Sequence, residues 1–141
     1  MRSRLKIAIA QISPVVGDIA GNTAKIRAAR AEAAAAGADL AVFCELVVAG
    51  YPPEDLLRKP SFQRACREAV EALAKETAKG PALVVGAPWR EDAALYNAAF
   101  LLADGETKAI RRKVKLPNYG VFDEPRHFTP GPPSNEIVKY R

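Results

Sequence analysis

The sequence predicts an α/β domain with a mixed β-sheet and helices on one face. Short apolar runs, typical of buried strands, alternate with helical segments in the first half of the chain. The second half contains strands with no helix between them, and Asp104-Gly105 is a strong two-residue hairpin signal. The expected order is therefore strand, helix, strand, helix and then three strands.

The first strand and helix are expected before Gly37. Leu5 to Ile12 has the alternation of a strand, with Ile7 and Ile9 on one face and small alanines on the other. A helix follows from Asn22, which is a good N-cap residue, to about Ala36. Gly37 then ends it.

The remaining elements are recognised by their apolar patterns. Leu40–Cys44 is a continuous apolar run, as in a strand covered on both faces. Ser61–Lys79 carries apolar residues at helical spacing, which predicts an amphipathic helix. The last three strands are expected at Ala82–Ala87, Leu95–Ala103 and Glu106–Val114.

Composition excludes several classes of protein. The 141 residues are 49% hydrophobic and 26% charged, which fits one globular domain. No apolar run approaches the roughly 20 residues that span a bilayer, and no signal peptide is recognisable. Cys44 and Cys66 fit a reducing compartment, so a cytoplasmic location is expected, and with the single His127 they cannot build a zinc cluster.

Glu45 and Lys113 are the candidates for chemistry. Glu45 follows a buried strand, where desolvation is expected to raise its pKa and prepare it as a general base, although a helix cap or ion-pair partner would also stand there. Lys113, at a strand end, suits stabilisation of an oxyanion, or is an ordinary solvated edge lysine. The loops Gly50–Pro53 and Leu116–Gly120 follow them, and each contains glycine, proline and tyrosine. Together they are expected to form one pocket.

The other side chains that could be reactive are expected to have structural roles. Cys44 is adjacent to Glu45, so on an extended chain the two side chains point to opposite faces. Cys66 lies on the apolar stripe of a helix and is expected in the core. His127, beside Phe128, is expected to pack within a loop, and Trp89, after Pro88, to anchor one.

Three segments resemble the nitrilase (carbon-nitrogen hydrolase) superfamily. They read KIAIAQISPVVGDIAGN, VFCELVVAGYPPEDLL and RRKVKLPNYGVFDEPRHFTPG, and the resemblance extends from Leu5 to Gly131. The forms GYPPEDLL and KLPNYGVFDE are more similar to the glutaminase branch, whose members hydrolyse glutamine to supply ammonia for NAD+ synthesis.

The resemblance implies an α-β-β-α sandwich and amide hydrolysis through a thioester on a cysteine nucleophile. By motif, Glu45 matches the general base, and Lys113 matches the lysine that steadies the tetrahedral intermediate. Tyr119 matches a tyrosine that contacts glutamine. The expected pocket neighbours, with Glu124 suited to a substrate ammonium, are Tyr51, Phe122 and Glu124.

The resemblance is incomplete, because no residue matches the nucleophilic cysteine, which lies in a third segment of the family. Residues 1–141 are therefore expected to be the first half of a glutaminase domain, inactive alone, with Ile137–Tyr140 beginning the next strand. Neither a Ser-Gly-Gly nor a GxxxxGK[ST] loop is present, so ATP and magnesium are expected only in a separate synthetase domain. A half sandwich leaves apolar surface uncovered, which predicts an oligomeric or poorly stable chain.

Three alternatives remain open. A fragment of another nitrilase-type amidase would act on a small amide other than glutamine. A non-catalytic interaction module would assemble with a complete subunit. Nucleic-acid binding through the basic run Lys108–Lys115 is suggested by the net charge of +5, although such runs are usually solvated surface.

Overall fold

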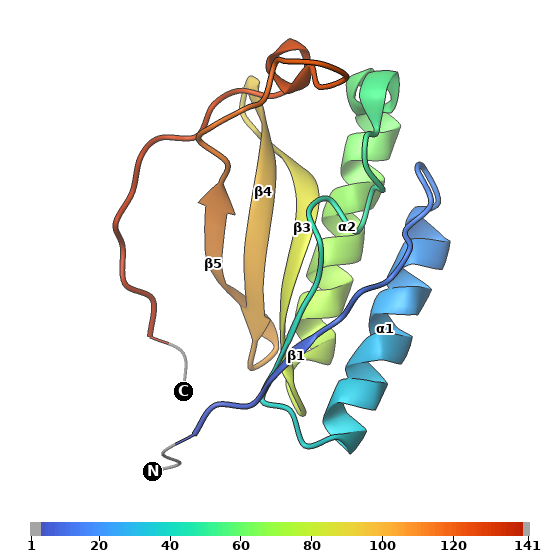
Figure 1. Cartoon of the computed structure of the whole chain (residues 1–141), viewed down its shortest axis with the longest axis vertical. Helices are drawn as coiled ribbons and strands as arrows, with labels where there is room; N and C mark the ends of the chain where they lie inside the picture. Colours follow the sequence, from blue (N-terminus) through green and yellow to red (C-terminus); the bar gives the residue numbers. More distant parts are fainter. Residues whose placement is uncertain (1–3, 140–141) are drawn as a thin grey trace.

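The computed structural model describes residues 4–139 and shows a five-stranded sheet with both α-helices on one face (Figure 1). The elements are β1 (Ile7–Ile9), α1 (Ile19–Ala35), β2 (Leu40–Val42), η1 (Glu54–Arg58), α2 (Pro60–Glu76), β3 (Ala82–Glu91), β4 (Ala94–Ala103), β5 (Glu106–Arg112) and η2 (Glu124–Arg126). Here η marks a short 3₁₀ helix. The predicted order of strands and helices, and the α/β class, are confirmed.

The sheet is mixed, with strand order β1-β2-β3-β4-β5. β1, β2 and β3 pair in parallel, whereas β3–β4 and β4–β5 are antiparallel. Two reversals restore the original direction, so β5 runs the same way as β2, and both strands end at the same edge of the sheet. The β4–β5 turn is made by Asp104 (φ 54°) and Gly105 (φ 85°), the left-handed pair that a tight hairpin requires.

The core lies between the helices and the sheet. Its fully buried side chains include Ile26, Val70, Leu73, Leu83 and Phe100. No helix in residues 4–139 is both long and apolar enough to cross a membrane.

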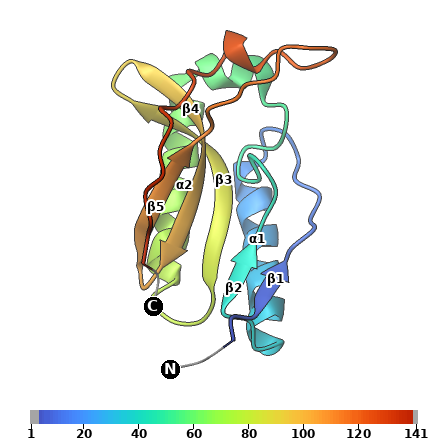
Figure 2. The ribbon, with the colours of Figure 1, turned by 60° about the vertical axis from the view of Figure 1, so that its left-hand side comes forward.

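Within residues 4–139, no helix covers the opposite face of the sheet (Figure 2). Leu5, Ile7 and Ile9 are 58%, 50% and 79% exposed at this side of β1. Ile7 and Ile9 therefore share a face, as predicted, and that face is the open one.

The predicted start of the first helix is wrong. α1 begins at Ile19 and is capped by Asp18, whose Oδ1 accepts a hydrogen bond from Gly21 N at 2.9 Å. Asn22 is fully buried instead: its Oδ1 accepts from Val15 N at 2.7 Å, and its Nδ2 donates to Val15 O at 2.8 Å and Val48 O at 3.1 Å. Asn22 thus joins two loops from inside the helix. The C-terminal prediction is confirmed, because Gly37 adopts φ 72° just past the helix.

The prediction that Trp89 anchors a loop is also wrong, because β3 continues through Pro88 to Glu91. β2 pairs only with the first residues of β3, so at Pro88 the β2 side of β3 has no neighbouring strand. The N–H that proline lacks is therefore not needed for a hydrogen bond between strands on that side. Trp89 is buried edge-on against Phe100 at 4.9 Å, and the Arg67 guanidinium lies 3.7 Å from the centre of its ring.

The C-terminal segment differs from its prediction as well. Residues 132–139 form no strand, and the segment is held to the sheet where Arg111 Nη1 donates to Ser134 O at 3.0 Å. Tyr140, the last residue of the expected strand, lies outside the described residues.

Asn22→Ala is expected to destabilise the chain more than Asp18→Ala. The first change leaves three backbone groups without their side-chain partner and is expected to cost about 3 kcal/mol of unfolding free energy. Loss of the cap costs about 1 kcal/mol. Urea unfolding of the two variants measures the difference, and equal costs would contradict the interior role of Asn22.

Candidate functional site

Glu45 and Lys113 meet at one edge of the sheet. Glu45 lies in the turn that follows β2, and Lys113 is the first residue after β5. Because β2 and β5 end at the same edge, Lys113 Nζ reaches Glu45 Oε1 at 2.7 Å. The pairing predicted from two strand ends is therefore present.

Lys113 is shared between two carboxylates. Its Nζ also lies 3.1 Å from Glu124 Oε1 and 3.0 Å from Glu124 Oε2. Glu124 is only 5% exposed, and it also accepts a hydrogen bond from the Tyr51 hydroxyl at 3.1 Å. The carboxylate that was expected to meet a substrate ammonium is thus already paired with the protein's own ammonium.

Asn97 completes this group and was not predicted. Its Nδ2 donates to Glu45 Oε1 at 2.5 Å, and its backbone oxygen accepts from Lys113 N at 2.8 Å. Asn97 is 4% exposed in the middle of β4. A buried polar side chain needs a partner, so an asparagine within the apolar run LYNAAF was the signal that could have identified it.

Gly86 allows the Glu45 turn to lie against β3. A Cβ at Gly86 would be 2.5 Å from Leu46 N, so no other residue fits without moving the backbone. Leu46 itself takes φ 50°, and Val48 N donates to Gly86 O at 3.2 Å. A glycine inside a strand pattern often marks such a close approach, and here the approach fixes the position of the Glu45 backbone.

The pKa of Glu45 is lowered, not raised as the sequence suggested. Burial alone would raise this pKa, but the hydrogen bonds from Lys113 and Asn97 outweigh it. Burial likewise tends to lower the pKa of Lys113, and its bonds to Glu45 and Glu124 raise it overall. Both groups are therefore held in their charged forms.

Cys44 and Glu45 line the same hollow, which has a volume of about 310 Å³ and also includes Gly86, Asn97 and Lys113. The expectation that they point to opposite faces is wrong, because β2 ends at Val42 and the chain is no longer an extended strand at Cys44. Burial, and then the charge of Glu45, raise the pKa of the Cys44 thiol.

Cys66 belongs to the core, as predicted. It is fully buried on α2, and burial raises the pKa of its thiol to about 12. The thiol is therefore kept protonated in a place that no solute reaches.

Aromatic residues surround the outer side of the group. Phe122 contacts both Tyr51 and Tyr119, with ring centres 6.4 Å and 5.6 Å apart. Tyr51 is tied to the Lys113 group through Glu124, and burial, followed by the charge of Glu124, raises the pKa of its hydroxyl to about 12. Tyr119, the expected glutamine contact, is 70% exposed and is not a lining residue of the Glu45 hollow.

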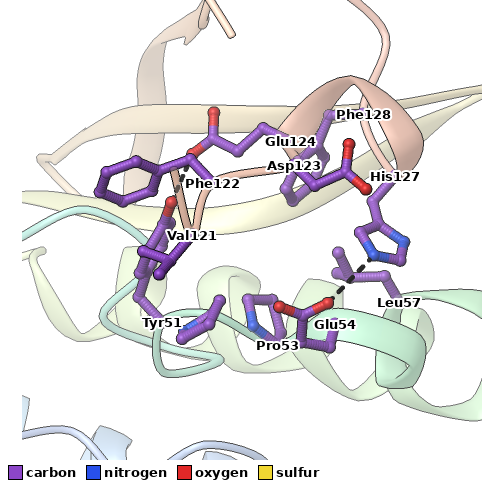
Figure 3. Close-up of a pocket in the computed structure, with 11 residues that line it drawn as sticks. Tyr51, Pro53, Glu54, Leu57, Val121, Phe122, Asp123, Glu124, His127 and Phe128 are labelled. Carbon is purple, nitrogen blue, oxygen red and sulfur yellow. Dashed lines mark hydrogen bonds and ion pairs between the residues drawn. The ribbon is translucent and has the colours of Figure 1, made fainter. Parts of the chain in front are cut away.

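A second cavity, of about 290 Å³, lies between the loops that carry Tyr51 and Glu124 (Figure 3). His127 lines it and is packed within its loop, as expected from the sequence, with a side chain only 6% exposed. The expected loop Gly50–Pro53 lines this cavity, but its other wall is formed by residues 121–128 and not by the expected Leu116–Gly120.

Three of the five basic residues in the run 108–115 pair with nearby carboxylates. Lys108 lies 2.6 Å from Glu106, and Arg112 makes a two-point contact with Glu91. Lys113 faces inward to Glu45 and Glu124. These pairings reduce the charge available to a polyanion and weigh against nucleic-acid binding, and they leave Arg111 and Lys115 as the exposed basic residues of the run.

Chemically, the group suits proton transfer beside a developing negative charge. Glu45 is an ionised carboxylate that can accept a proton, and Lys113 is a fixed ammonium that can stabilise an anion next to it. Within residues 4–139 no three His, Cys, Asp or Glu side chains are grouped so as to hold a metal ion.

Comparisons with known proteins agree on one family. A family profile described as carbon-nitrogen hydrolase matches residues 6–138. The chain is 44% identical over 128 residues to a glutamine-dependent NAD(+) synthetase of Thermotoga maritima, a match that covers 91% of this chain and 22% of the relative. The corresponding protein of Rhodobacter capsulatus is 42% identical, with 97% of this chain and 25% of the relative covered. The chain thus spans about a quarter of the length of these relatives.

Solved structures share the fold. A glutamine-dependent NAD+ synthetase from Acinetobacter baumannii, in complex with ADP, superposes with a TM-score of 0.85 at 40% identity and covers 92% of this chain and 24% of its own. An amidase from Nesterenkonia sp. gives 0.80 at 28% identity, with 96% and 51% covered. Another structure of that amidase is described as showing Michael addition of acrylamide at its active-site cysteine.

The lowered pKa of Glu45 predicts a pH dependence that Glu45→Gln removes. The ionised carboxylate contributes stability above its unfolded pKa near 4.5, and this stability is lost as the pH falls through the lower folded pKa. Between about pH 6 and about pH 3, wild type should therefore lose more unfolding free energy than the variant.

Urea unfolding at both pH values checks this expectation. Glu68→Gln, on the exposed side of α2, is the matched control and should follow wild type. Equal losses in wild type and Glu45→Gln would contradict the charge pairing of Glu45.

Proposed function

We propose, from the premise that the chain belongs to the carbon-nitrogen hydrolase family, that it forms part of a glutaminase that hydrolyses the amide of glutamine and supplies ammonia for NAD+ synthesis. The observation that carries the proposal is the Glu45–Lys113 contact of 2.7 Å, in a chain 44% and 42% identical to glutamine-dependent NAD(+) synthetases. Glutamine is the proposed substrate.

In the proposed reaction, Glu45 is the general base. It takes the proton from a cysteine thiol as the sulfur attacks the amide carbon, and the carbonyl electrons move to oxygen. The Lys113 ammonium lies beside that oxygen and stabilises its negative charge. Collapse of the intermediate breaks the C–N bond, the leaving nitrogen takes up a proton as ammonia, and water then releases the acid from the thioester.

Glu124 and Tyr51 hold Lys113 in place in this proposal. A lysine side chain is long and flexible, so a buried carboxylate 3.0 Å from its ammonium fixes its position. Tyr51 in turn fixes Glu124 through the 3.1 Å hydrogen bond. Tyr119 and Phe122 are proposed as contacts for the rest of the substrate, since both lie on the loop that follows Lys113.

The nucleophile is proposed to come from a further segment of a complete domain. Cys66 is enclosed in the core, and burial, followed by the charge of Glu45, raises the pKa of the Cys44 thiol. The Nesterenkonia amidase uses a cysteine described as its active-site residue, and this chain covers 51% of one of its structures. The 141-residue chain is accordingly proposed to be inactive by itself.

The proposed partner is a synthetase domain, which would hold ATP and magnesium and consume the ammonia. The chain matches relatives named for both glutamine and NAD+ over only 22% to 25% of their length. A cytoplasmic location is proposed from the two free thiols, Cys44 and Cys66, which suit a reducing compartment.

An amidase acting on another small amide is the second candidate, favoured by the TM-score of 0.80 with the Nesterenkonia amidase. The two candidates differ in substrate alone. Ammonia release from glutamine and from propionamide therefore separates them.

The activity test uses a chimera in which this chain is continued by the remainder of the carbon-nitrogen hydrolase domain of the Acinetobacter baumannii relative. Glu45→Gln and Lys113→Met are each expected to lower kcat for glutamine by about 100-fold or more, because each removes a group that acts in the transition state. Glu68→Gln is the control and should keep full activity.

Three outcomes would contradict the proposal. One is full activity in Glu45→Gln, and another is faster turnover of propionamide than of glutamine. The third is covalent labelling of Cys44 or Cys66 at the substrate site by a thiol-reactive glutamine analogue.

The isolated chain is also proposed to self-associate through the open sheet face, which exposes Leu5, Ile7 and Ile9. Sedimentation velocity should show species larger than a monomer, and Ile9→Lys should shift the distribution toward monomer. A strictly monomeric wild type with a sharp two-state melt would contradict this.

A further inference from the structure

Asn97 is buried on a face of the sheet that is otherwise open. Side chains alternate along a strand, so Asn97 and Ala99 of β4 lie on the same face, and both line the hollow that contains Glu45. Ala99 is exposed there, whereas Asn97 is only 4% exposed. Asn97 therefore owes its burial to groups that lie on the open face, and Glu45 is in direct contact with it.

Asn97 contacts both members of the Glu45–Lys113 pair, one through its side chain and the other through its backbone. Its Nδ2 donates to Glu45 Oε1 at 2.5 Å, and its backbone oxygen accepts from Lys113 N at 2.8 Å. The first contact joins β4 to the turn after β2, and the second continues the β4–β5 pairing beyond Arg112. A change of the Asn97 side chain therefore removes the first contact and leaves the second in place.

The two donors to Glu45 reach the same carboxylate oxygen. Lys113 Nζ lies 2.7 Å from Oε1, and Asn97 Nδ2 lies 2.5 Å from it. A carboxylate oxygen has two lone pairs, so these two donors occupy Oε1. Oε2 is therefore the oxygen that remains to take a proton.

Asn97 and Lys113 differ in what else they contact. The Lys113 ammonium also lies 3.0 Å from Glu124 Oε2, and in the proposed reaction it stabilises an oxyanion. The Asn97 amide is neutral, and Glu45 is its carboxylate partner. When the ammonium turns toward the oxyanion, Asn97 still holds Oε1. A neutral donor does so without a second positive charge, which would make Glu45 a weaker base.

We propose that Asn97 is a positioning residue for the proposed amide hydrolysis, a role that rests on Glu45 being the general base of that reaction. The Asn97 amide fixes Oε1, and the thiol proton passes to Oε2. Asn97 itself neither gains nor loses a proton. Because its hydrogen bond is made to a carboxylate, it also favours the ionised form of Glu45, which is the form that can act as a base.

Other charged and titratable groups also surround Glu45. Burial tends to raise the pKa of Glu45, and the hydrogen bonds from Lys113 and then Asn97 lower it. The further neighbours are Cys44 in the same turn, the Tyr51 hydroxyl, the Glu124 carboxylate and the Arg111 guanidinium, which lines the hollow. A substitution of Asn97 leaves all of these side chains in the protein, so a change in the Glu45 titration is assigned to the lost amide.

Two variants separate the amide donor from the shape of the side chain. Asn97→Ala removes the donor, and the pKa of Glu45 is expected to rise as a result. Asn97→Asp keeps the shape but places a second carboxylate beside Glu45. Like charges disfavour each other, so this pair is expected to take up its first proton at a higher pH than Glu45 does in wild type.

Carboxyl ¹³C NMR of the 141-residue chain measures the titration, and the Glu45 signal is identified by its loss in Glu45→Gln. Leu102→Val changes the core further along the same strand and should leave the Glu45 midpoint unchanged. Far-UV circular dichroism shows whether each variant is folded. If one variant at position 97 does not fold, the other still gives the comparison.

The chimera with the Acinetobacter baumannii relative adds a kinetic readout. At a pH where Glu45 is ionised, Asn97→Ala and Asn97→Asp are each expected to lower kcat for glutamine by about tenfold or more. KM should change little, because the lost interaction acts in the transition state. The acid limb of kcat/KM reports protonation of the base in the free enzyme, so it is expected to move to higher pH. A role in packing alone would leave this limb in place.

An unchanged Glu45 titration in both variants overturns the proposal, and so does wild-type kcat in Asn97→Asp. The NMR titration involves no amide hydrolysis. If the wild-type chimera releases no ammonia from glutamine, the proposed glutaminase is contradicted instead, and the titration still decides whether Asn97 holds Glu45.

Discussion

The Lys113 ammonium is the interaction on which the rest of the site depends. It lies between Glu45 and Glu124, two carboxylates that would repel each other without it. Glu124 is 5% exposed, and a buried carboxylate without a counter-charge is strongly unfavourable. The orientation of Tyr51, and through it the contact between the two loops, follows from this one cation. A single lysine thus joins the sheet edge to both loops.

The sequence predicted the principal residues of the site but not their electrostatic state. Strand ends and motif resemblance identified Glu45 and Lys113, and the direction of β5 brings them together. Glu45 was expected to be desolvated with a raised pKa, but its side chain is 45% exposed and its pKa is lowered. The outcome depends on Lys113 and Asn97 as hydrogen-bond donors, and a contact between residues 52 positions apart cannot be read from local sequence.

The prediction of the fold was right where one local sequence pattern indicated an element. It was wrong where two residues or patterns suggested different boundaries for the same element. Apolar runs and the Asp104-Gly105 turn identified the order of elements. Asp18 and Asn22 are both good N-caps, and only tertiary contacts show that Asn22 is needed inside, between Val15 and Val48. Pro88 suggested the end of a strand, because the sequence does not reveal that β2 pairs with only the beginning of β3.

The β4–β5 hairpin has a consequence for how the site assembles during folding. Asn97 and Lys113 belong to one hairpin, so a short loop closure brings them together early. Glu45 is 68 positions from Lys113 and arrives only when β2 joins β3 in parallel, a slower kind of pairing. This difference in sequence separation predicts that the Lys113 ammonium is in place before Glu45 arrives. In kinetic terms, the β4–β5 hairpin is expected to form first, and the β1-α1-β2 unit is expected to pack beside it afterwards. Formation of the Glu45–Lys113 contact would therefore mark the docking of that N-terminal unit.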